Sequence, residues 1–315
     1  MLALQAGEGS LALAPEMGGS IVGWTLGPYH VLRPPLVDAL VQGSARGMAA
    51  FPLVPYSNRI DHGRFSFAGR TYQLARNFGD EPHSIHGVGW TSVWDVAEVS
   101  ARAARLTLAH RARGAAALGW PFPFEAELRF ALEPDGLTVG LAMTNRHDQP
   151  VPAGLGLHPF FPRTQEATLR FAASGVWRNG TDHLPSEHVV VPAEWDHRAP
   201  RRVGSATLDN LFTGWDGAAE IALAPTPVTV RLSASALFRR FVVFVPEGKP
   251  FFATEPVSHR TDAINHPDED TGLRVLEPGA VLAGEIRFQV GYSRPQVSWD
   301  KHSRSVGRSL WHPEP

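Results

Sequence analysis

Between residues 128 and 145 the sequence LRFALEPDGLTVGLAMTN alternates apolar and polar side chains on either side of Pro134-Asp135-Gly136. Alternation with a period of two is typical of a β-strand, because successive side chains of a strand point to opposite faces of the sheet. Proline, aspartate and glycine in sequence favour a turn. The segment therefore predicts two antiparallel strands joined by a tight turn.

Short strand-like runs recur along the rest of the chain, and helical periodicity is weak everywhere. The best helical candidate, around residues 97–104, is short and rich in Ala and Arg, so a strand edge or loop remains open there. Glycines (30) and prolines (27) are scattered, which favours many turns over one disordered tract. The sequence therefore predicts an all-β sandwich or barrel. Further runs with β-branched or aromatic residues lie at 105–112, 228–235, 238–246 and 285–292.

No internal repeat and no linker divides the 315 residues, which contain enough apolar side chains for one large core. We expect residues 1–292 to form one domain and residues 293–315, where strand patterning is lost, to form an extended C-terminal tail. Trp299 and Trp311 indicate that this tail packs on its own subunit or on a neighbour. Residues 33–50 are expected to form a long loop.

Composition excludes several classes of function. The chain has no cysteine, so disulfides, thiolate metal sites and cysteine nucleophiles are excluded. A formal net charge of −2 gives no electrostatic reason to expect nucleic acid or an anionic membrane as a partner. No apolar stretch reaches the roughly 20 residues of a membrane-spanning helix, and the amino terminus lacks the basic region of a signal peptide. We therefore expect a soluble, cytoplasmic protein, as a monomer or homodimer.

Two early segments place polar groups among residues that are expected to be buried. In FPLVPYSNRI, Asn58 and Arg59 offer donors and acceptors for sugar hydroxyls, although an arginine that pairs with a carboxylate of a loop is the simpler interpretation. In HSIHGVGW, His83 and His86 precede glycines and Trp90. Two histidines three residues apart suggest metal ligands, but no motif such as HExxH accompanies them. A sugar pocket with the Trp90 indole as an apolar platform is favoured instead.

Two later segments each contain one titratable side chain in an apolar setting. His158 ends the run PVPAGLGLH and precedes Pro159 and two phenylalanines. It is either a hydrogen-bonded core residue or a general acid whose titration depends on partial burial. Glu255 follows the strand-like FFAT, where an unpaired carboxylate is costly unless it is functional.

Taken in order, these segments resemble the aldose 1-epimerase (galactose mutarotase) family over roughly residues 1–292. Four segments resemble the family's motifs around the sugar site: PYSNRI, SIHG, GLHPFF and TEPVSHRTDAIN. Trp94 fits an aromatic residue downstream of the SIHG motif. A fifth segment, LDNLFTGWDG, resembles the one that carries a substrate-binding aspartate, which points to Asp209. Proline after both His158 and Glu255 departs from the galactose-specific branch, so the identity of the sugar stays open.

The resemblance implies a large antiparallel β-sandwich, the galactose mutarotase-like supersandwich, with a monosaccharide bound in a groove. It implies an isomerase that needs neither metal nor other cofactor, with Glu255 as the base and His158 as the acid. His86, Arg59, Asn58 and Asp209 would then hold the sugar. A hexose-6-phosphate 1-epimerase and a non-catalytic sugar-binding protein remain alternatives. We expect a neutral aldose to be preferred over its 6-phosphate, unless Arg163 and Arg260 converge on the groove.

Overall fold

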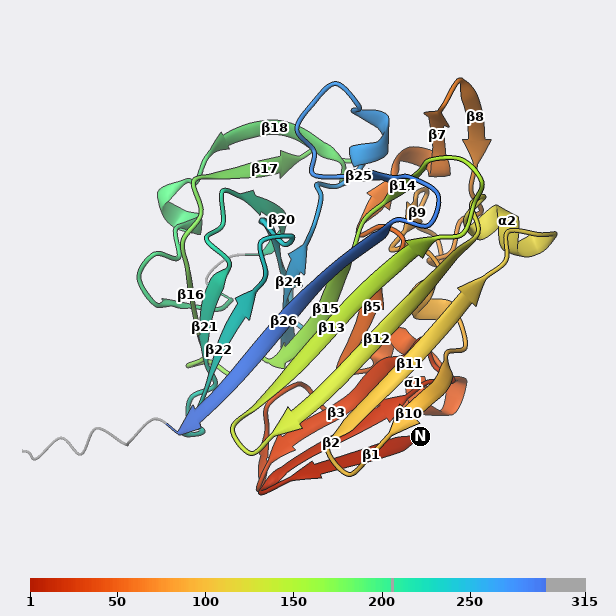
Figure 1. Cartoon of the computed structure of the whole chain (residues 1–315). Helices are drawn as coiled ribbons and strands as arrows, with labels where there is room; N and C mark the ends of the chain where they lie inside the picture. Colours follow the sequence, from red (N-terminus) through yellow and green to blue (C-terminus); the bar gives the residue numbers. More distant parts are fainter. Residues whose placement is uncertain (205–206, 293–315) are drawn as a thin grey trace, which may run out of the picture.

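A computed structural model describes residues 1–204 and 207–292. Two large sheets face each other, as Figure 1 shows, and strand pairing within each of them is antiparallel in the described ranges. This confirms the predicted all-β sandwich. The expected tail at 293–315, with Trp299 and Trp311, lies outside the described residues.

The first sheet has 11 strands in the described part of the chain. In spatial order they are β1 (Leu2–Ala6), β2 (Gly9–Ala14), β3 (Ser20–Leu26), β5 (Ala50–Leu53), β15 (Gly156–Pro162), β24 (Phe251–Val257), β23 (Arg240–Val245), β20 (Leu208–Thr213), β17 (Gly175–Asn179) and β18 (Pro185–Val190), with β4 (Tyr29–His30) beside β3.

The second sheet has nine strands in the described part. Their order is β10 (Asp95–Val99), β11 (Ala103–His110), β12 (Phe124–Glu133), β13 (Gly136–Asn145), β26 (Val281–Tyr292), β22 (Val228–Ala234), β21 (Ala218–Ala222), β16 (Thr168–Phe171) and β19 (Arg201–Arg202).

Three short two-stranded ribbons and a few short helices complete the described fold. The ribbons pair β14 (Val151–Ala153) with β25 (Arg274–Leu276), β6 (Arg59–Ile60) with β9 (Ser84–Ile85), and β7 (Arg64–Phe67) with β8 (Arg70–Gln73). The helices are α1 (Val37–Gln42), α2 (Ala115–Gly119), η1 (Ala45–Gly47), η2 (Asp61–Gly63), η3 (Gly89–Thr91), η4 (Ala193–Trp195) and η5 (Ala263–Asn265). Among the described residues, no helix is long and apolar enough to cross a membrane.

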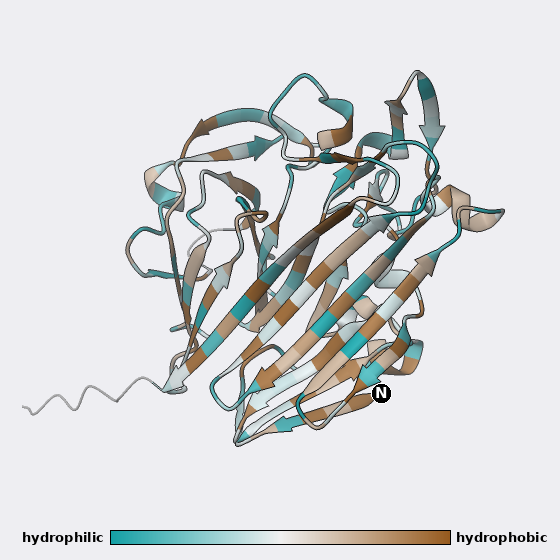
Figure 2. Ribbon diagram, viewed as in Figure 1, coloured by the Kyte–Doolittle hydropathy of each residue, from teal (hydrophilic) through white to brown (hydrophobic). Residues whose placement is uncertain are grey.

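The hairpin predicted around Pro134-Asp135-Gly136 is confirmed. Glu133 of β12 pairs with Gly136 of β13, so Pro134 and Asp135 form the connection. Buried and exposed side chains alternate along β12 over its ten residues, and Figure 2 shows the same alternation as bands of hydropathy. Because one set of side chains packs inward and the other meets solvent, a strand of this sheet can have one buried and one wet face.

The main core fills the space between the sheets. Trp24 of β3 meets Phe288 of β26 edge-on at a centroid distance of 6.1 Å, and both rings are buried. The strands at the centre of the first sheet are different, because β24 is buried along both faces from Phe252 to Val257. One of its faces packs toward the core, and the other supports a second apolar cluster that includes Phe51, Phe160 and Val242.

Two expectations are corrected by the structure. Residues 33–50 are not simply a loop, since they contain α1 and η1 before β5 begins at Ala50. Pro34 and Pro35 precede the helix, and Gly43 in the left-handed conformation (φ 64°) ends it, both of which are ordinary helix-boundary signals. The helical candidate at 97–104 instead spans the end of β10 and the start of β11, in agreement with the strand-edge alternative.

Candidate functional site

A cavity of about 910 Å³ opens over the face of the first sheet that carries the second apolar cluster. Strand register explains which side chains reach it. Gly156 pairs with Val257 and Phe160 with Ala253, so His158 of β15 lies opposite Glu255 of β24. On the far side of β15, His158 pairs with Phe51 of β5. Side chains opposite one another in antiparallel strands share a face, so these three residues form one row under the cavity.

His158 and Glu255 are in direct contact. His158 Nε2 lies 3.1 Å from Glu255 Oε1, and the two residues are only 6% and 2% exposed. His158 Nδ1 and Glu255 Oε2 are buried without a hydrogen-bond partner in the described residues. Since buried polar atoms are normally paired, two orphan atoms on cavity-lining side chains are typical of groups positioned for a ligand.

Burial shifts the titration of the two residues in opposite directions. Loss of solvent raises the pKa of Glu255 well above its ordinary value, with Asp209 adding to the effect and Arg59 opposing it. Burial also lowers the pKa of His158 well below its ordinary value, and the nearby His86 and Arg33 lower it further. Burial therefore favours the neutral carboxyl group and the neutral imidazole over the ion pair. One group that can give a proton and one that can take it lie side by side.

His86 and Asn58 hold each other in place. The His86 backbone N–H donates to the Asn58 carbonyl (2.9 Å), and the Asn58 backbone N–H donates to His86 Nδ1 (3.0 Å). An imidazole that accepts at Nδ1 carries its proton on Nε2. Burial, followed by the charge of Arg59, lowers the pKa of His86 to about 3. His86 is therefore a neutral hydrogen-bond donor at the cavity wall.

Both residues adopt positive φ angles, 63° for His86 and 61° for Asn58. This region is uncommon for residues other than glycine and costs on the order of 1–3 kcal/mol per residue. The exchange of hydrogen bonds between the two segments offsets this cost.

Arg59 connects two carboxylates at the rim. Its Nε donates to Glu81 (3.0 Å), and its Nη1 donates to Asp209 (3.3 Å) and to the side-chain oxygen of Asn58 (3.3 Å). Asp209 reaches the cavity from β20, where it pairs in register with Phe244 of β23. The Arg59–Glu81 pair thus also agrees with the simpler interpretation of the sequence, in which the arginine pairs with a loop carboxylate. Asn58, Arg59, His86, His158, Asp209 and Glu255 all line the cavity.

Trp90 does not line the cavity. Its ring is 4% exposed and lies behind Phe51 and Phe78, at centroid distances of 5.7 and 5.8 Å. The predicted indole platform is corrected accordingly, since phenylalanines form the apolar wall, among them Phe51, Phe78, Phe160, Phe244 and Phe251. Trp94 belongs to the main core and donates from Nε1 to the Gly89 carbonyl (2.9 Å).

His83 is also absent from the cavity lining. It lies near Asp61 and His62, and ligand-type atoms of the three are close enough to hold an ion. However, His83 Nδ1 accepts the backbone N–H of His62 (2.9 Å), and Nε2 bonds the carbonyl of Asp182 (2.9 Å). Both ring nitrogens are therefore committed to the protein, which disfavours His83 as a metal ligand.

The two arginines considered for the rim of the groove lie elsewhere. Arg163 donates to the Pro246 carbonyl, and Arg260 pairs with Glu269 and stacks on Trp177. Three cations that the sequence reasoning missed line the cavity instead: Arg33, Arg46 and Lys249. Arg33 and Arg46 come from the segment expected to be a loop, and no local motif marks them.

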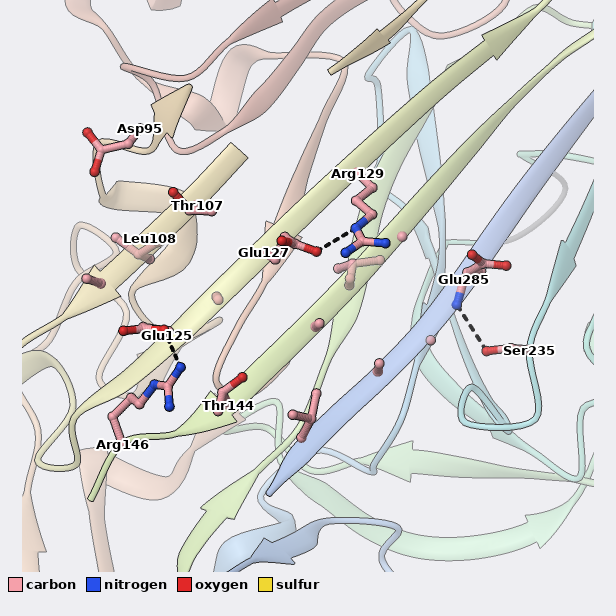
Figure 3. A pocket seen from close by; sticks show the side chains of 18 residues that line it. Asp95, Thr107, Leu108, Glu125, Glu127, Arg129, Thr144, Arg146, Ser235 and Glu285 are labelled. Atoms are coloured by element: carbon pink, nitrogen blue, oxygen red, sulfur yellow. Dashed lines mark hydrogen bonds and ion pairs between the residues drawn. The ribbon is translucent and has the colours of Figure 1, made fainter. Parts of the chain in front are cut away.

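A second hollow, of about 850 Å³, lies on the outer face of the other sheet. Figure 3 shows two ion pairs among its charged side chains, Glu127 with Arg129 and Glu125 with Arg146. These carboxylates are satisfied by their neighbours and exposed to solvent to different degrees. The candidate site is therefore the cavity over β15 and β24, which combines buried acid–base groups with unpaired polar atoms.

Comparison with known proteins agrees with the fold described above. Residues 1–289 match the family model for aldose 1-epimerase. The Escherichia coli K12 protein YphB, described as uncharacterized, is 30% identical over 292 residues, which cover 90% of this chain and 97% of YphB. An E. coli K12 structure, provisionally assigned as an aldose 1-epimerase, superposes with a TM-score of 0.83 at 29% identity, covering 92% of this chain and 98% of that one. A galactose mutarotase-like protein from Clostridium acetobutylicum gives a TM-score of 0.83 at 19% identity over 92% and 94% of the two chains, which supports the fold alone.

Proposed function

The chain belongs to the aldose 1-epimerase family, and from that premise we propose that it interconverts the α and β anomers of a free aldose by opening and reclosing the sugar ring. The observation that supports this proposal most directly is the buried contact of His158 Nε2 with Glu255 Oε1, at 3.1 Å on the floor of the cavity. Anomer interconversion needs one group that accepts a proton and one that donates a proton, and the two contacting side chains can fill these roles.

In the proposed reaction the pair acts as carboxylate and imidazolium, the form reached when the carboxyl proton of Glu255 moves to His158. Glu255 takes the proton of the C1 hydroxyl while His158 gives its proton to the ring oxygen. The C1–O5 bond breaks and the C1 aldehyde forms. After the aldehyde turns its other face, both proton transfers run in reverse and the ring closes as the other anomer. Each such transfer typically contributes about 10²–10⁴-fold to the rate.

The remaining cavity residues are proposed to hold the sugar. His86 can donate from Nε2, while Arg59 and Asp209 offer a fixed donor and an acceptor at the rim. Asn58 is held through its backbone and its side-chain oxygen, which leaves its amide N–H groups for a ligand. Fixed groups of this kind matter because a misplaced C1 weakens both proton transfers together.

This mechanism assigns no step to a metal or other cofactor. A cytoplasmic location, a monomeric or homodimeric state, and residues 1–292 as one domain stay predictions. A sugar-binding protein without catalytic activity is the alternative on the same fold.

The test is the rate at which freshly dissolved monosaccharides reach anomeric equilibrium, followed by polarimetry or NMR exchange. The wild-type protein should accelerate this rate for at least one aldose. Glu255→Gln should lower kcat by about 10²–10⁴-fold because the amide keeps the shape of the side chain and cannot take the proton. His158→Asn should lower kcat by a similar factor with a smaller change in KM.

Glu285→Gln is a matched control, because it makes the same chemical change on the outer face of the opposite sheet. It should leave kcat unchanged. Near wild-type kcat in folded Glu255→Gln would refute the assignment of the base. Binding of sugars without any acceleration by the wild-type protein would favour the non-catalytic alternative.

A further inference from the structure

Arg33 is a buried cation at the cavity. The residue comes shortly after β4 in the sequence and is 3% exposed. Nε and Nη2 donate to the Met48 carbonyl (3.2 and 2.9 Å), and Nη2 also donates to the Arg46 carbonyl (2.7 Å). The guanidinium stacks on Phe160 and Phe251, with Cζ 3.6 and 4.3 Å from the ring centroids. These contacts fix the position of the charge.

Arg33 has no carboxylate partner in the part of the chain that the structure describes. Its Nη1 makes no hydrogen bond there either, although Arg33 lines the cavity. Burial lowers its pKa to about 10, so the side chain stays charged at neutral pH. Buried charges are normally paired because removal of an ion from water is costly. A partner for this charge can reach it from the cavity.

Two exposed cations line the same cavity. Arg46 of η1 lies over the Phe78 ring, with Cζ 3.6 Å from the centroid, and Lys249 lies on the turn before β24. Within residues 1–204 and 207–292, neither forms an ion pair. Asp38 of α1 also lines the cavity, but no ion pair joins it to any of the three cations. Three cations that line the cavity therefore have no carboxylate partner among the described residues.

Arg33 adjoins the acid–base pair. The ring of Phe160 stacks on His158 at a centroid distance of 4.3 Å and on Arg33 at 3.6 Å. One phenyl ring thus contacts both side chains. A sugar whose C1 lies at His158 and Glu255 can therefore place a substituent from its far end near Arg33.

We propose that Arg33, Arg46 and Lys249 form a subsite for an acidic group of the sugar, a carboxylate or a phosphate at the end remote from C1. The inference rests on the proposed anomer interconversion at the same cavity. It replaces the expectation that a neutral aldose is preferred, which assigned Arg59 to sugar hydroxyls and considered only Arg163 and Arg260 for a phosphate. The Arg46 guanidinium suits both anions because its donors match paired oxygens, and Arg33 adds the Nη1 donors that its carbonyl contacts leave free.

The first experiment compares kcat/KM for mutarotation within matched sugars at fixed ionic strength. Glucose is compared with glucuronate and with glucose 6-phosphate, and galactose with galacturonate. We expect at least a tenfold preference for one acidic sugar over its neutral counterpart, and a smaller preference at higher salt. The comparison of glucuronate with glucose 6-phosphate shows whether a carboxylate or a phosphate fits the subsite better. Equal or lower kcat/KM for every acidic sugar would overturn the proposal.

Variants test whether these cations cause the preference. Arg46→Gln with Lys249→Met removes two exposed charges, and it should reduce the preference for the acidic sugar at least tenfold. Arg33→Met keeps an apolar stem between the two phenyl rings and should have a similar effect if it folds. Arg70→Gln on β8, an exposed arginine outside the cavity lining, is the matched control. A preference that persists in the double variant would contradict the subsite.

Binding separates this inference from the proposed reaction. Calorimetric titration of Glu255→Gln with the same sugars does not depend on catalysis. Tighter binding of an acidic sugar, without acceleration by the wild-type protein, would support the subsite and refute the epimerase mechanism. Acceleration of neutral sugars alone, with no tighter binding of acidic ones, would refute the subsite and leave the mechanism standing.

Discussion

The stability of the fold depends on the protonation state of two buried histidines, His86 and His259. His259 accepts the Ser57 backbone N–H at Nε2 (3.1 Å) and donates from Nδ1 to the Arg260 carbonyl (2.7 Å), so it is satisfied only when neutral. Burial lowers its pKa to about 4 and that of His86 to about 3. The unfolded chain binds protons at these positions below about pH 6.5, and the folded chain does not until much lower pH. The free energy of unfolding is therefore lost as the pH falls through this window.

We predict that each of these histidines lowers the free energy of unfolding by about 2 kcal/mol between pH 7 and pH 5. His259→Gln should remove one contribution, so the loss on acidification should be about 2 kcal/mol smaller in this variant than in the wild type. Urea denaturation at the two pH values measures the difference. The raised pKa of Glu255 acts in the opposite direction, but it is common to both proteins and cancels. The same loss in both proteins would show that His259 titrates normally in the fold.

Metal removal should leave the activity unchanged. Both nitrogens of His83 are bonded to the protein, and the proposed chemistry needs only His158 and Glu255 as acid and base. The measurement is the mutarotation rate after dialysis against EDTA, compared with dialysis against buffer alone. Loss of activity that one divalent metal restores would contradict the mechanism.

At the scale of elements, the loop between β9 and η3 depends on glycine. Gly87 has a φ of 69°, and a Cβ there would lie 2.4 Å from the Val54 carbonyl oxygen. That oxygen also accepts the N–H groups of Val88 (3.1 Å) and Gly89 (3.0 Å). The close approach holds the loop against the end of β5, and His86 is the preceding residue. Position 86 is thus fixed by a contact that only glycine permits.

We predict that Gly87→Ala lowers both the thermal midpoint and kcat/KM, because the methyl group displaces the loop that carries His86. Gly43→Ala is the matched control, since Gly43 has a similar φ of 64° and open space around the added Cβ. It should cost only the strain of a left-handed alanine, about 1 kcal/mol, and leave kcat/KM unchanged. Equal effects of the two substitutions would show that the Val54 contact is unimportant.

At the scale of the whole molecule, stability depends on the interface between the two sheets. Phe288 of β26 is fully buried against Trp24, whereas the adjacent Arg287 points to the outer face and pairs with Glu133 at 3.2 Å. The two adjacent side chains therefore lie on opposite faces of one strand. Burial of a large side chain contributes far more to stability than an exposed ion pair does.

Phe288→Ala should destabilise the protein by about 3–5 kcal/mol because it leaves a cavity between the sheets. Arg287→Ala should cost no more than about 1 kcal/mol. Thermal and urea midpoints of the two variants measure the contrast. Similar midpoints would mean that the interface between the sheets does not limit unfolding.

The fold could be predicted from local patterns, because alternation with period two depends only on neighbours in sequence. The hairpin at Pro134-Asp135 follows from it directly. The short helix after Pro34 and Pro35 was missed because six residues give too little periodicity, although Gly43 was an available signal. At the cavity, the motif residues could be named in advance, but Trp90 was misplaced. An apolar ring beside a motif gives no indication of whether it faces the cavity or lies behind another ring.

The sequence by itself determined the strands, their turns and the residue types available for acid–base chemistry, since these are properties of short segments. Only the tertiary structure decided that His158 lies opposite Glu255, because register between β15 and β24 joins residues 97 positions apart. It also decided their pKa shifts, which come from burial and not from residue type. Arg33 illustrates the same point. Its charge is evident in the sequence, but the absence of a carboxylate near it in the described residues emerges only when distant strands assemble around it.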